Sequence, residues 1–335
     1  MSARVLPSLR KLLASRATSV AAPTGNSYEL VGRLDETGVP AYVGTSRDGA
    51  PSILLPLAAT ADVPARLTAG LAFWAAPSVE FSYGNEKWSD AAAILECRDP
   101  ALLQTFIVMA AHLIESLPFG AKPSWANVVT LFDDWEKMLR RRRPLASEDE
   151  LGLWGELRLI VDSARLDDLV AAWQGPDAET VDFVLDAMGF EVKTTRRSGV
   201  HFVSQSQVER PLGELPMYFV ACDVAVDPVS GRSVVDLVDL ISERCTDPTS
   251  FERKLLGVGF SRADGAAYGR KYLLTRSPWV YPQDAIPRVR SADPGVSQLR
   301  YRVDLDSTRA LSGGPYENIL QRFAPEGAWT PYGPE

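Results

Sequence analysis

The chain has 335 residues, 46% hydrophobic and 23% charged, with a net charge of −8. This composition is typical of globular proteins, and the length favours two domains or one elaborated domain. Two histidines are too few for a multi-histidine metal site. Three scattered cysteines without C-x-x-C spacing argue against disulfides and zinc, and favour a reducing, cytoplasmic compartment. No apolar run approaches the ~20 residues that a membrane helix needs.

The N-terminal third of the sequence predicts a leader followed by a β-rich domain. Residues 1–23 are basic and rich in serine and alanine, and their leucines recur at helical spacing. An amphipathic helix or frayed leader is favoured over a transit peptide, which the composition loosely resembles. Residues 24–120 alternate in strand fashion up to position 97, and Asp99-Pro100 then opens a helix over residues 101–117. We therefore predict an N-terminal β-rich domain with one helix.

Basic residues gather in two places of this acidic chain. Residues 121–146 are predicted to form a helical connector, whose helix over 127–142 ends in four arginines at 140–143 before Pro144. Residues 252–302 carry ten basic and four acidic side chains, a net charge of +6. Phosphate contact and an ordinary solvated surface are both open interpretations of these arginines.

A long helix is predicted over residues 147–172. Ser147 is the expected N-cap residue. Gly152 and Gly155 should let the backbone of the helix approach its neighbours closely. Glu156 lies near the buried face, where a carboxylate needs a partner because burying an unpaired charge is costly.

The elements that follow predict an α/β or α+β core. Three strands separated by turns are expected at 181–185, 190–195 and 200–203, then an apolar central strand at 217–225, and then helices at 234–244 and 250–256.

Two carboxylates and an ammonium recur along the first two of these strands. Asp182 and Glu191 are hard oxygen ligands of the kind that Mg²⁺, or Mn²⁺ in its place, prefers. Lys193 shares a strand face with Glu191 and could orient a water or stabilise charge on a phosphoryl group. Glu156 would add a third acid, and Gln207 could hydrogen-bond the water or a nucleic-acid backbone.

Less specific interpretations of the same residues stay open at this point. Glu191 and Lys193 could form an ordinary cross-strand ion pair. Glu156 could be a surface acid paired beside Arg158, and a structural role is favoured for His201.

Several short motifs carry a resemblance to a known family. They are Trp154-Gly155-Glu156-Leu157, Trp173-Gln174-Gly175-Pro176, Asp182-Phe183-Val184, Glu191-Val192-Lys193-Thr194-Thr195, and His201-Phe202-Val203-Ser204 with Gln207. In these motifs the chain resembles the PD-(D/E)XK nuclease superfamily. More closely, it resembles the bacterial "PD-(D/E)XK motif" proteins, once catalogued as a domain of unknown function and often encoded near restriction or phage-defence genes.

The resemblance implies a restriction-endonuclease-like α/β core over residues 147–310, with a mixed central sheet flanked by helices in αβββαβ order and a tail at 311–335. It maps the metal ligands to Asp182, Glu191 and Glu156, and further catalytic roles to Lys193 and Gln207. Val181 stands where the motif has proline. That departure makes the motif less specific without removing a chemical group.

The activity implied is a Mg²⁺-dependent DNA endonuclease or nuclease subunit of a defence system. Its expected partners are DNA and defence subunits such as a methyltransferase or an ATPase or helicase, with a homodimer as a further candidate assembly and no membrane partner. Two alternatives stay open: a non-catalytic DNA-binding or interaction subunit on a nuclease-like fold, and an RNA nuclease using the same site.

Overall fold

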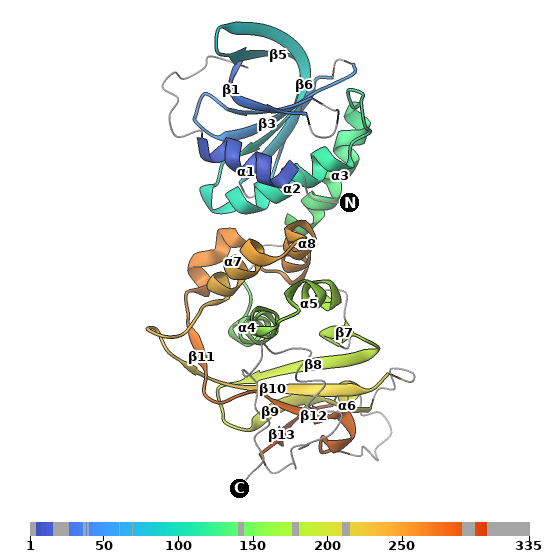
Figure 1. The fold of residues 1–335 in the computed structure, drawn as a ribbon, viewed down its shortest axis with the longest axis vertical. Coiled ribbons are helices and arrows are strands. Elements are labelled where there is room, and N and C mark those ends of the chain that lie inside the picture. Colours follow the sequence, from blue (N-terminus) through green and yellow to red (C-terminus); the bar gives the residue numbers. More distant parts are fainter. Residues whose placement is uncertain are drawn as a thin grey trace. The chain divides into compact units, whose positions relative to one another are not determined.

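The computed structural model describes residues 5–15, 27–35, 38, 40–59, 61–68, 70–139, 144–175, 181–209, 215–289 and 299–306. The chain divides into two compact units (Figure 1). The N-terminal unit comprises Met1–Arg143 with Ser261–Ala263, and the C-terminal unit comprises Pro144–Phe260 with Asp264–Glu335. The four arginines at 140–143 and the tail at 311–335 lie outside the described residues.

The N-terminal unit is built on a curved sheet that closes on itself. Its strands are β1 (Ser27–Leu34), β2 (Ala41–Thr45), β3 (Pro51–Pro56), β4 (Val63–Leu67), β5 (Leu71–Tyr83) and β6 (Glu86–Cys97). Hydrogen bonding follows the order β1-β2-β3-β6-β5, and the end of β5 pairs in parallel with the start of β1. This circuit makes a small barrel, and β4 pairs outside it with β5.

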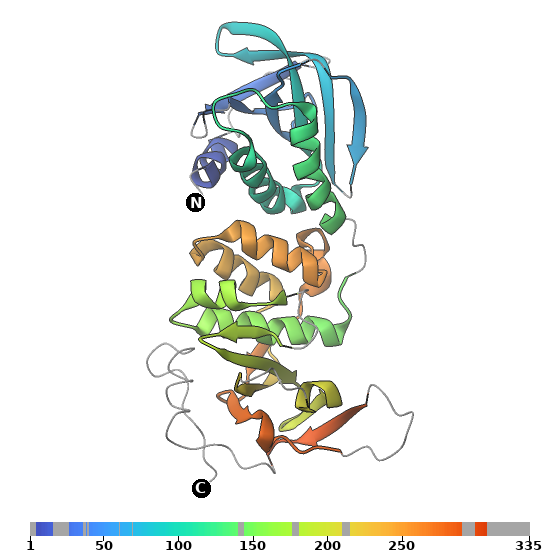
Figure 2. The ribbon, with the colours of Figure 1, turned by 90° about the vertical axis from the view of Figure 1, so that its right-hand side faces the viewer.

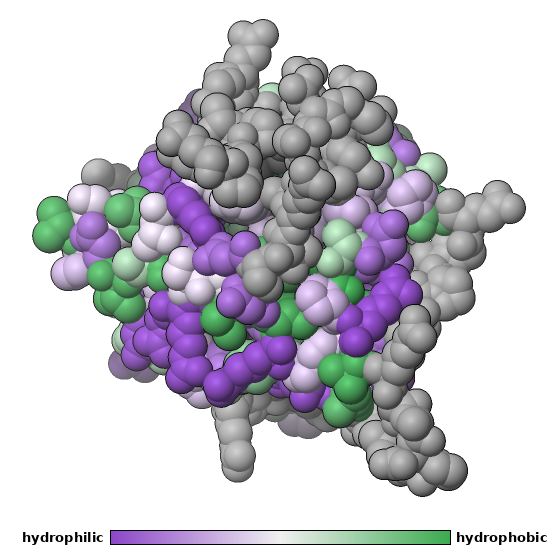
Figure 3. Space-filling view, turned by 90° about the horizontal axis from the view of Figure 1, so that it is seen from below, coloured by the Kyte–Doolittle hydropathy of each residue, from purple (hydrophilic) through white to green (hydrophobic). Residues whose placement is uncertain are grey.

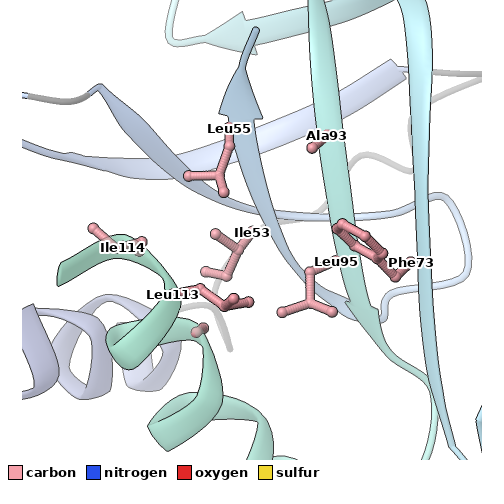
Figure 4. Close-up of a pocket in the computed structure, with 8 residues that line it drawn as sticks. Ile53, Leu55, Phe73, Ala93, Leu95, Leu113 and Ile114 are labelled. Carbon is pink, nitrogen blue, oxygen red and sulfur yellow. The ribbon is translucent and has the colours of Figure 1, made fainter. Parts of the chain in front are cut away.

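Alternation along the strands gives this sheet two apolar faces. Leu54 points into the barrel, where it packs with Phe81 and Ile94. Its neighbours Ile53 and Leu55 point to the other face, because successive strand residues alternate. That face meets Leu113 and others on helix α2 (Leu103–Ser116), as Figure 4 shows. Burying both faces requires the nearly continuous apolar sequence that β3 has.

Two further helices complete the N-terminal unit (Figure 2). Helix α1 (Val5–Ser15) buries Leu6 and Leu9 and contacts α2 and β1, so the predicted leader helix is part of this unit. Helix α3 (Trp125–Leu139) places Phe132 in a stack on Phe73, with ring centroids 4.2 Å apart. The predicted helix after Asp99-Pro100 is confirmed, and the Asp99 side chain caps its first turn.

The C-terminal unit follows a mixed α/β order. Its first half contains α4 (Ser147–Asp162), α5 (Leu166–Ala172), β7 (Phe183–Leu185), β8 (Met188–Thr195), β9 (Val200–Ser204) and α6 (Gln205–Glu209). Its second half contains β10 (Met217–Val226), α7 (Val234–Arg244), α8 (Pro248–Val258), β11 (Tyr272–Leu274), β12 (Trp279–Pro282) and β13 (Arg300–Asp304).

Strand β8 lies in the middle of the sheet of this unit. It pairs antiparallel with β7 on one edge and parallel with β10 on the other. Strand β10 in turn pairs antiparallel with β11 and β12, so the sheet is mixed. Helices α4, α5, α7 and α8 lie on one side of it, and β9, β13 and α6 lie on the other (Figures 1 and 2).

The long helix predicted over residues 147–172 differs from the structure in its middle and in its N-cap residue. It breaks into α4 and α5, because the buried Ser163 leaves the helical conformation and its hydroxyl accepts the Arg165 backbone N–H. The N-cap residue is Ala146, not Ser147. The Ser147 hydroxyl instead accepts a hydrogen bond from Arg270, 3.0 Å away.

The third strand of the predicted run does not join the sheet. Strand β9 pairs with β13 in a separate two-stranded ribbon. Strand β10 pairs with β8 along residues 189–195, whereas β7 covers the other edge of β8 only at residues 188–190. The turn before β9 is held by the Asp223 carboxylate of β10, which accepts the Gly199 backbone N–H at 3.1 Å.

The face of the C-terminal unit that carries the β9–β13 ribbon is mainly hydrophilic (Figure 3). Phe202 is 41% exposed there, with the guanidinium groups of Arg300 and Arg302 lying 5.3 and 4.8 Å from its ring centroid. The three cysteines of the chain are buried and form no disulfide. Among the described helices, none has the length and apolar character to cross a bilayer.

Candidate active site

Glu191 and Lys193 share one face of β8 and touch. The Lys193 ammonium donates to Glu191 Oε1 at 2.6 Å, and the Glu191 side chain is only 5% exposed. The alternation of a strand puts residues two apart on the same face, which is why the sequence predicted this neighbourhood. An ordinary ion pair within the strand would show the same contact between Glu191 and Lys193, so a catalytic role depends on the residues that surround this pair.

Asp182 lies against β8 just before β7 begins. Strand β7 begins only at Phe183, so the Val192 N–H has no strand partner on that side. The Asp182 carboxylate accepts that N–H at 2.6 Å. Its backbone is fixed as well, since its own N–H donates to Phe190 and its carbonyl accepts from Gln174. The acid is thus held at the Val192 backbone, between Glu191 and Lys193 along β8.

Glu156 approaches from helix α4. A side chain at Gly155 would collide with the Thr194 hydroxyl, so this glycine allows α4 to pack directly on β8. Gly152 has no atom within 4 Å of the place where a side chain would begin, so the close approach predicted there is wrong. Glu156 does not pair beside Arg158, which binds Asp162 at 2.6 Å.

Trp173 is the partner of Glu156. Its indole N–H donates to Glu156 Oε2 at 2.7 Å, and its ring is fully buried beside Phe251. The Lys254 ammonium holds the end of helix α5 and Trp173 in place by donating to the backbone carbonyls of Val170, Ala171 and Trp173. Sequence reasoning assigned no role to either residue, because neither contact follows from spacing along the chain.

Electrostatics tie the three acids together. The pKa of Glu156 is raised to about 7, mainly by burial. The charge of Glu191 also raises this pKa, whereas the hydrogen bond from Trp173 and the charge of Lys193 lower it. Burial also raises the pKa of Asp182 well above its usual value, and the charges of Glu191 and Glu156 add to that. One ammonium therefore faces three carboxyl groups, and the site is short of positive charge.

Gln207 also belongs to this cluster. Its side-chain amide donates to Glu191 Oε1 at 2.5 Å. Its amide oxygen accepts the Ser204 backbone N–H at 3.1 Å, and its own backbone N–H donates to the Ser204 hydroxyl. This local lock fixes the orientation of the side chain. The structure thus brings all five predicted site residues together, and their catalytic roles stay predictions.

His201 lies in a different cluster. It is 1% exposed, and its Nε2 is 3.3 Å from Asp223 Oδ1. Arg276 contacts the same aspartate at 2.6 Å. Burial would raise the pKa of Asp223, but the polar contact with His201, the hydrogen bond from Gly199 and the charge of Arg276 outweigh it, so that pKa is lowered. This arrangement pins the turn before β9 and agrees with a structural role for His201.

The predicted basic segment does not form one face. Lys254 caps helix α5, Arg276 binds Asp223 and Asp306, and Arg270 binds Ser147. Arg300 and Arg302 are the members that lie exposed over Phe202. Only part of the excess charge is therefore free to meet a phosphate backbone.

The donor chemistry of the cluster fits a hard divalent cation. Each of the three acids has one carboxylate oxygen bound by a protein donor, namely the Trp173, Val192 or Lys193 N–H groups. Within the described residues, the second oxygen of each has no protein partner. Mg²⁺ needs only one or two protein carboxylates, since it keeps several of its waters. No three such side chains in the described ranges converge as a ready-made metal group.

Comparison with known families decides the classification. A family model described as "Putative PD-(D/E)XK family member, (DUF4420)" matches residues 20–306. The chain belongs to this family. The match spans both compact units, so the N-terminal barrel is part of the family's architecture and not an unrelated addition. Searches of curated proteins and of solved structures each found no significant match.

Proposed function

We propose that this PD-(D/E)XK family member is a Mg²⁺-dependent phosphodiesterase that cleaves DNA, as an endonuclease or nuclease subunit of a bacterial restriction or phage-defence system. The observation that carries the proposal is the gathering of Asp182, Glu191 and Glu156 with Lys193, each acid being held by a donor of the protein, and the raised pKa values of Glu156 and Asp182 support it. The order α4, β7, β8, β9, α6, β10 also supports a core of the αβββαβ type. Acids with perturbed pKa values that gather at one place are a feature of active sites.

Asp182 and Glu191 are the residues that would hold the metal ion, with Glu156 as a third ligand. When bound, the ion would act as a Lewis acid toward the phosphodiester and lower the pKa of a bound water. The chain's own part is to hold the ligands: the Val192 N–H orients Asp182, and the Trp173 indole orients Glu156. Such supporting contacts fix ligand geometry and tune ligand basicity.

Lys193 would stabilise negative charge that develops on the attacked phosphate. Its ammonium has three N–H groups, and one of them donates to Glu191 in the structure. Another can therefore reach a phosphoryl oxygen without breaking that contact. Gln207 lies on helix α6, and its side-chain amide donates to the same Glu191 oxygen that Lys193 binds. We assign it the role of keeping Glu191 in place.

The exposed Phe202 with Arg300 and Arg302 supports a nucleic-acid partner. Aromatic rings flanked by guanidinium groups suit both stacking and phosphate contact. A methyltransferase, an ATPase or helicase, and a second copy of the chain are proposed as further partners from the family resemblance. Their presence would place the cleavage in a defence complex.

Cleavage of plasmid DNA with Mg²⁺ or Mn²⁺ tests the proposal. We expect Asp182→Ala and Lys193→Ala to lose activity by roughly 100-fold or more, the scale on which removal of one charge-stabilising group acts. Glu148→Ala, at an exposed acid in the first turn of α4, is the matched control and should keep full activity. Unchanged cleavage by the two site variants, with their circular dichroism intact, would sink the assignment.

A non-catalytic binding subunit is the second candidate. It is favoured by the engagement of Glu191 with Lys193 and by the lack of a converged acidic triad in the described residues. Calorimetric titration with Mn²⁺ separates the two functions: binding that is lost in Asp182→Asn supports the enzyme, and no binding supports the subunit. Running the cleavage assay on RNA in parallel distinguishes the nuclease's substrate.

A further inference from the structure

The mouth of the N-terminal barrel contains a cavity of about 380 Å³. It is lined by Leu30 and Arg33 of β1, Tyr42 of β2, Tyr83 of β5, and Glu86 and Trp88 of β6. We call it the barrel-mouth pocket. Its volume lies within the ~300–1,000 Å³ typical of small-ligand sites. The barrel interior beneath it is filled by side chains such as Leu54 and Phe81, so a ligand would bind at the mouth only.

The aromatic wall of the pocket is rigidly supported from behind. Trp88 stacks on the buried Phe81, with ring centroids 5.4 Å apart and ring planes 7° apart. Tyr42 packs at a tilt against both rings, 5.7 Å from Trp88. Tyr83, which is 52% exposed, stands at the opening. Rings held in this way lose little freedom on binding, which favours a flat ligand that stacks.

Both signs of charge lie at the rim. The Arg33 side chain is 55% exposed, and its Nε–H donates to Asp35 at 2.6 Å, which leaves the terminal N–H groups of the guanidinium available. Glu86 is exposed and, among the described residues, forms no ion pair. A simple cation would be repelled by Arg33, and a simple anion by Glu86. A flat polar ring attached to a phosphate satisfies both.

We propose that the barrel-mouth pocket binds one unpaired nucleobase by stacking on its aromatic side chains, with Glu86 accepting hydrogen bonds from the base and Arg33 contacting its phosphate. Stacking on aromatic side chains is tolerant of base identity, and a carboxylate selects bases that offer N–H donors. The site belongs to the N-terminal unit alone, so it does not depend on cleavage by the C-terminal unit. The base is supplied by a free nucleotide or by a single strand.

Fluorescence anisotropy with a labelled single-stranded hexanucleotide tests this site in the full chain. The measurements use an Asp182→Asn background, so that binding is read without cleavage. We expect Tyr83→Ala to weaken binding roughly 5- to 150-fold, since stacking one base contributes ~1–3 kcal/mol. Tyr83→Phe keeps the ring and should retain affinity. Phe119→Ala removes another aromatic side chain of the unit, 82% exposed and outside the pocket, and should change nothing.

Competition experiments identify the source of the base. Displacement of the probe by a nucleoside monophosphate indicates a single-nucleotide site, whereas displacement by single strands alone indicates a strand-binding site. Either result supports the pocket, provided that Tyr83→Ala and Arg33→Ala weaken it. The proposal is overturned if neither ligand binds, if both variants bind like the parent, or if duplex DNA competes as well as a single strand. None of these results changes the outcome expected for plasmid cleavage.

Discussion

Glu156→Gln should remove a pH dependence from the stability of the C-terminal unit. In the metal-free protein, burial raises the pKa of Glu156 from 4.5 to about 7. A carboxyl whose folded-state pKa is raised makes its full contribution to stability below the unfolded pKa and loses it as pH rises through the folded pKa. Each pKa unit corresponds to ~1.4 kcal/mol, so the difference between 4.5 and about 7 is on the order of 3 kcal/mol.

The expected result is that the parent chain loses more stability between pH 4.5 and pH 8 than Glu156→Gln does, by about that amount, because the raised pKa of Asp182 contributes to the loss in both chains. Because the chain has two units, one unfolding curve would mix them. Methionine oxidation in a urea series with EDTA, read by mass spectrometry, separates them. Met217 is buried on β10 and reports the C-terminal unit, and Met109 is buried on α2 and reports the N-terminal unit.

Two controls make this result decisive. Glu148→Gln changes an exposed acid on the same helix and should leave the pH profile of the parent. Met109 should show no difference between any of the variants. If the parent and Glu156→Gln lose the same stability over this pH range at Met217, the burial and coupling of Glu156 argued above are refuted.

Three further predictions concern the support of the site. Trp173→Phe keeps the buried ring but removes the indole donor that lowers the pKa of Glu156, so the midpoint of the pH-dependent loss at Met217 should move up by roughly one pKa unit or more. Gly155→Ala should destabilise the C-terminal unit by about 1–3 kcal/mol, because the new methyl group makes α4 clash with β8. Gly152→Ala, at a position with open space around it, should be neutral or should stabilise the unit by up to ~1 kcal/mol. Equal effects of the two variants in urea unfolding would contradict the close packing of α4 on β8. Lys254→Met keeps the aliphatic stem but leaves three carbonyl groups without their donor, so the free energy of unfolding should fall by about 1–3 kcal/mol in the same assay. An unchanged free energy of unfolding would mean that these contacts do not stabilise the unit.

Much of the candidate site could be predicted because its determinants are local. The alternation of a strand placed Glu191 and Lys193 on one face, and that face is where the structure shows them. A glycine beside Glu156 predicted a helix packed close to the sheet, and Gly155 makes that contact. These inferences need only the geometry of one element and its immediate neighbour.

The remainder depends on contacts between distant parts of the chain. Nothing in the sequence of β9 shows that its partner is β13, which lies far away along the chain, so this pairing could not be inferred. The indole of Trp173 reaches Glu156 only because the helix breaks at Ser163 and α5 folds back. The stretch Asp162-Ser163-Ala164-Arg165 contains neither proline nor glycine, so it carries no strong signal for a helix break.

The contacts of Lys254 with the carbonyls of Val170, Ala171 and Trp173 determine which fragments of the protein can keep the site intact. All five predicted site residues lie between positions 156 and 207, which suggests that a short fragment ending after β10 would be a sufficient nuclease core. Such a fragment would lack Lys254, whose ammonium donates to the Trp173 carbonyl. It would also lack the Gln283 amide, which donates to the Gln207 carbonyl. A fragment chosen by motif boundaries would therefore contain every acid of the site and none of these distant supports, and its inactivity would say nothing about the intact protein.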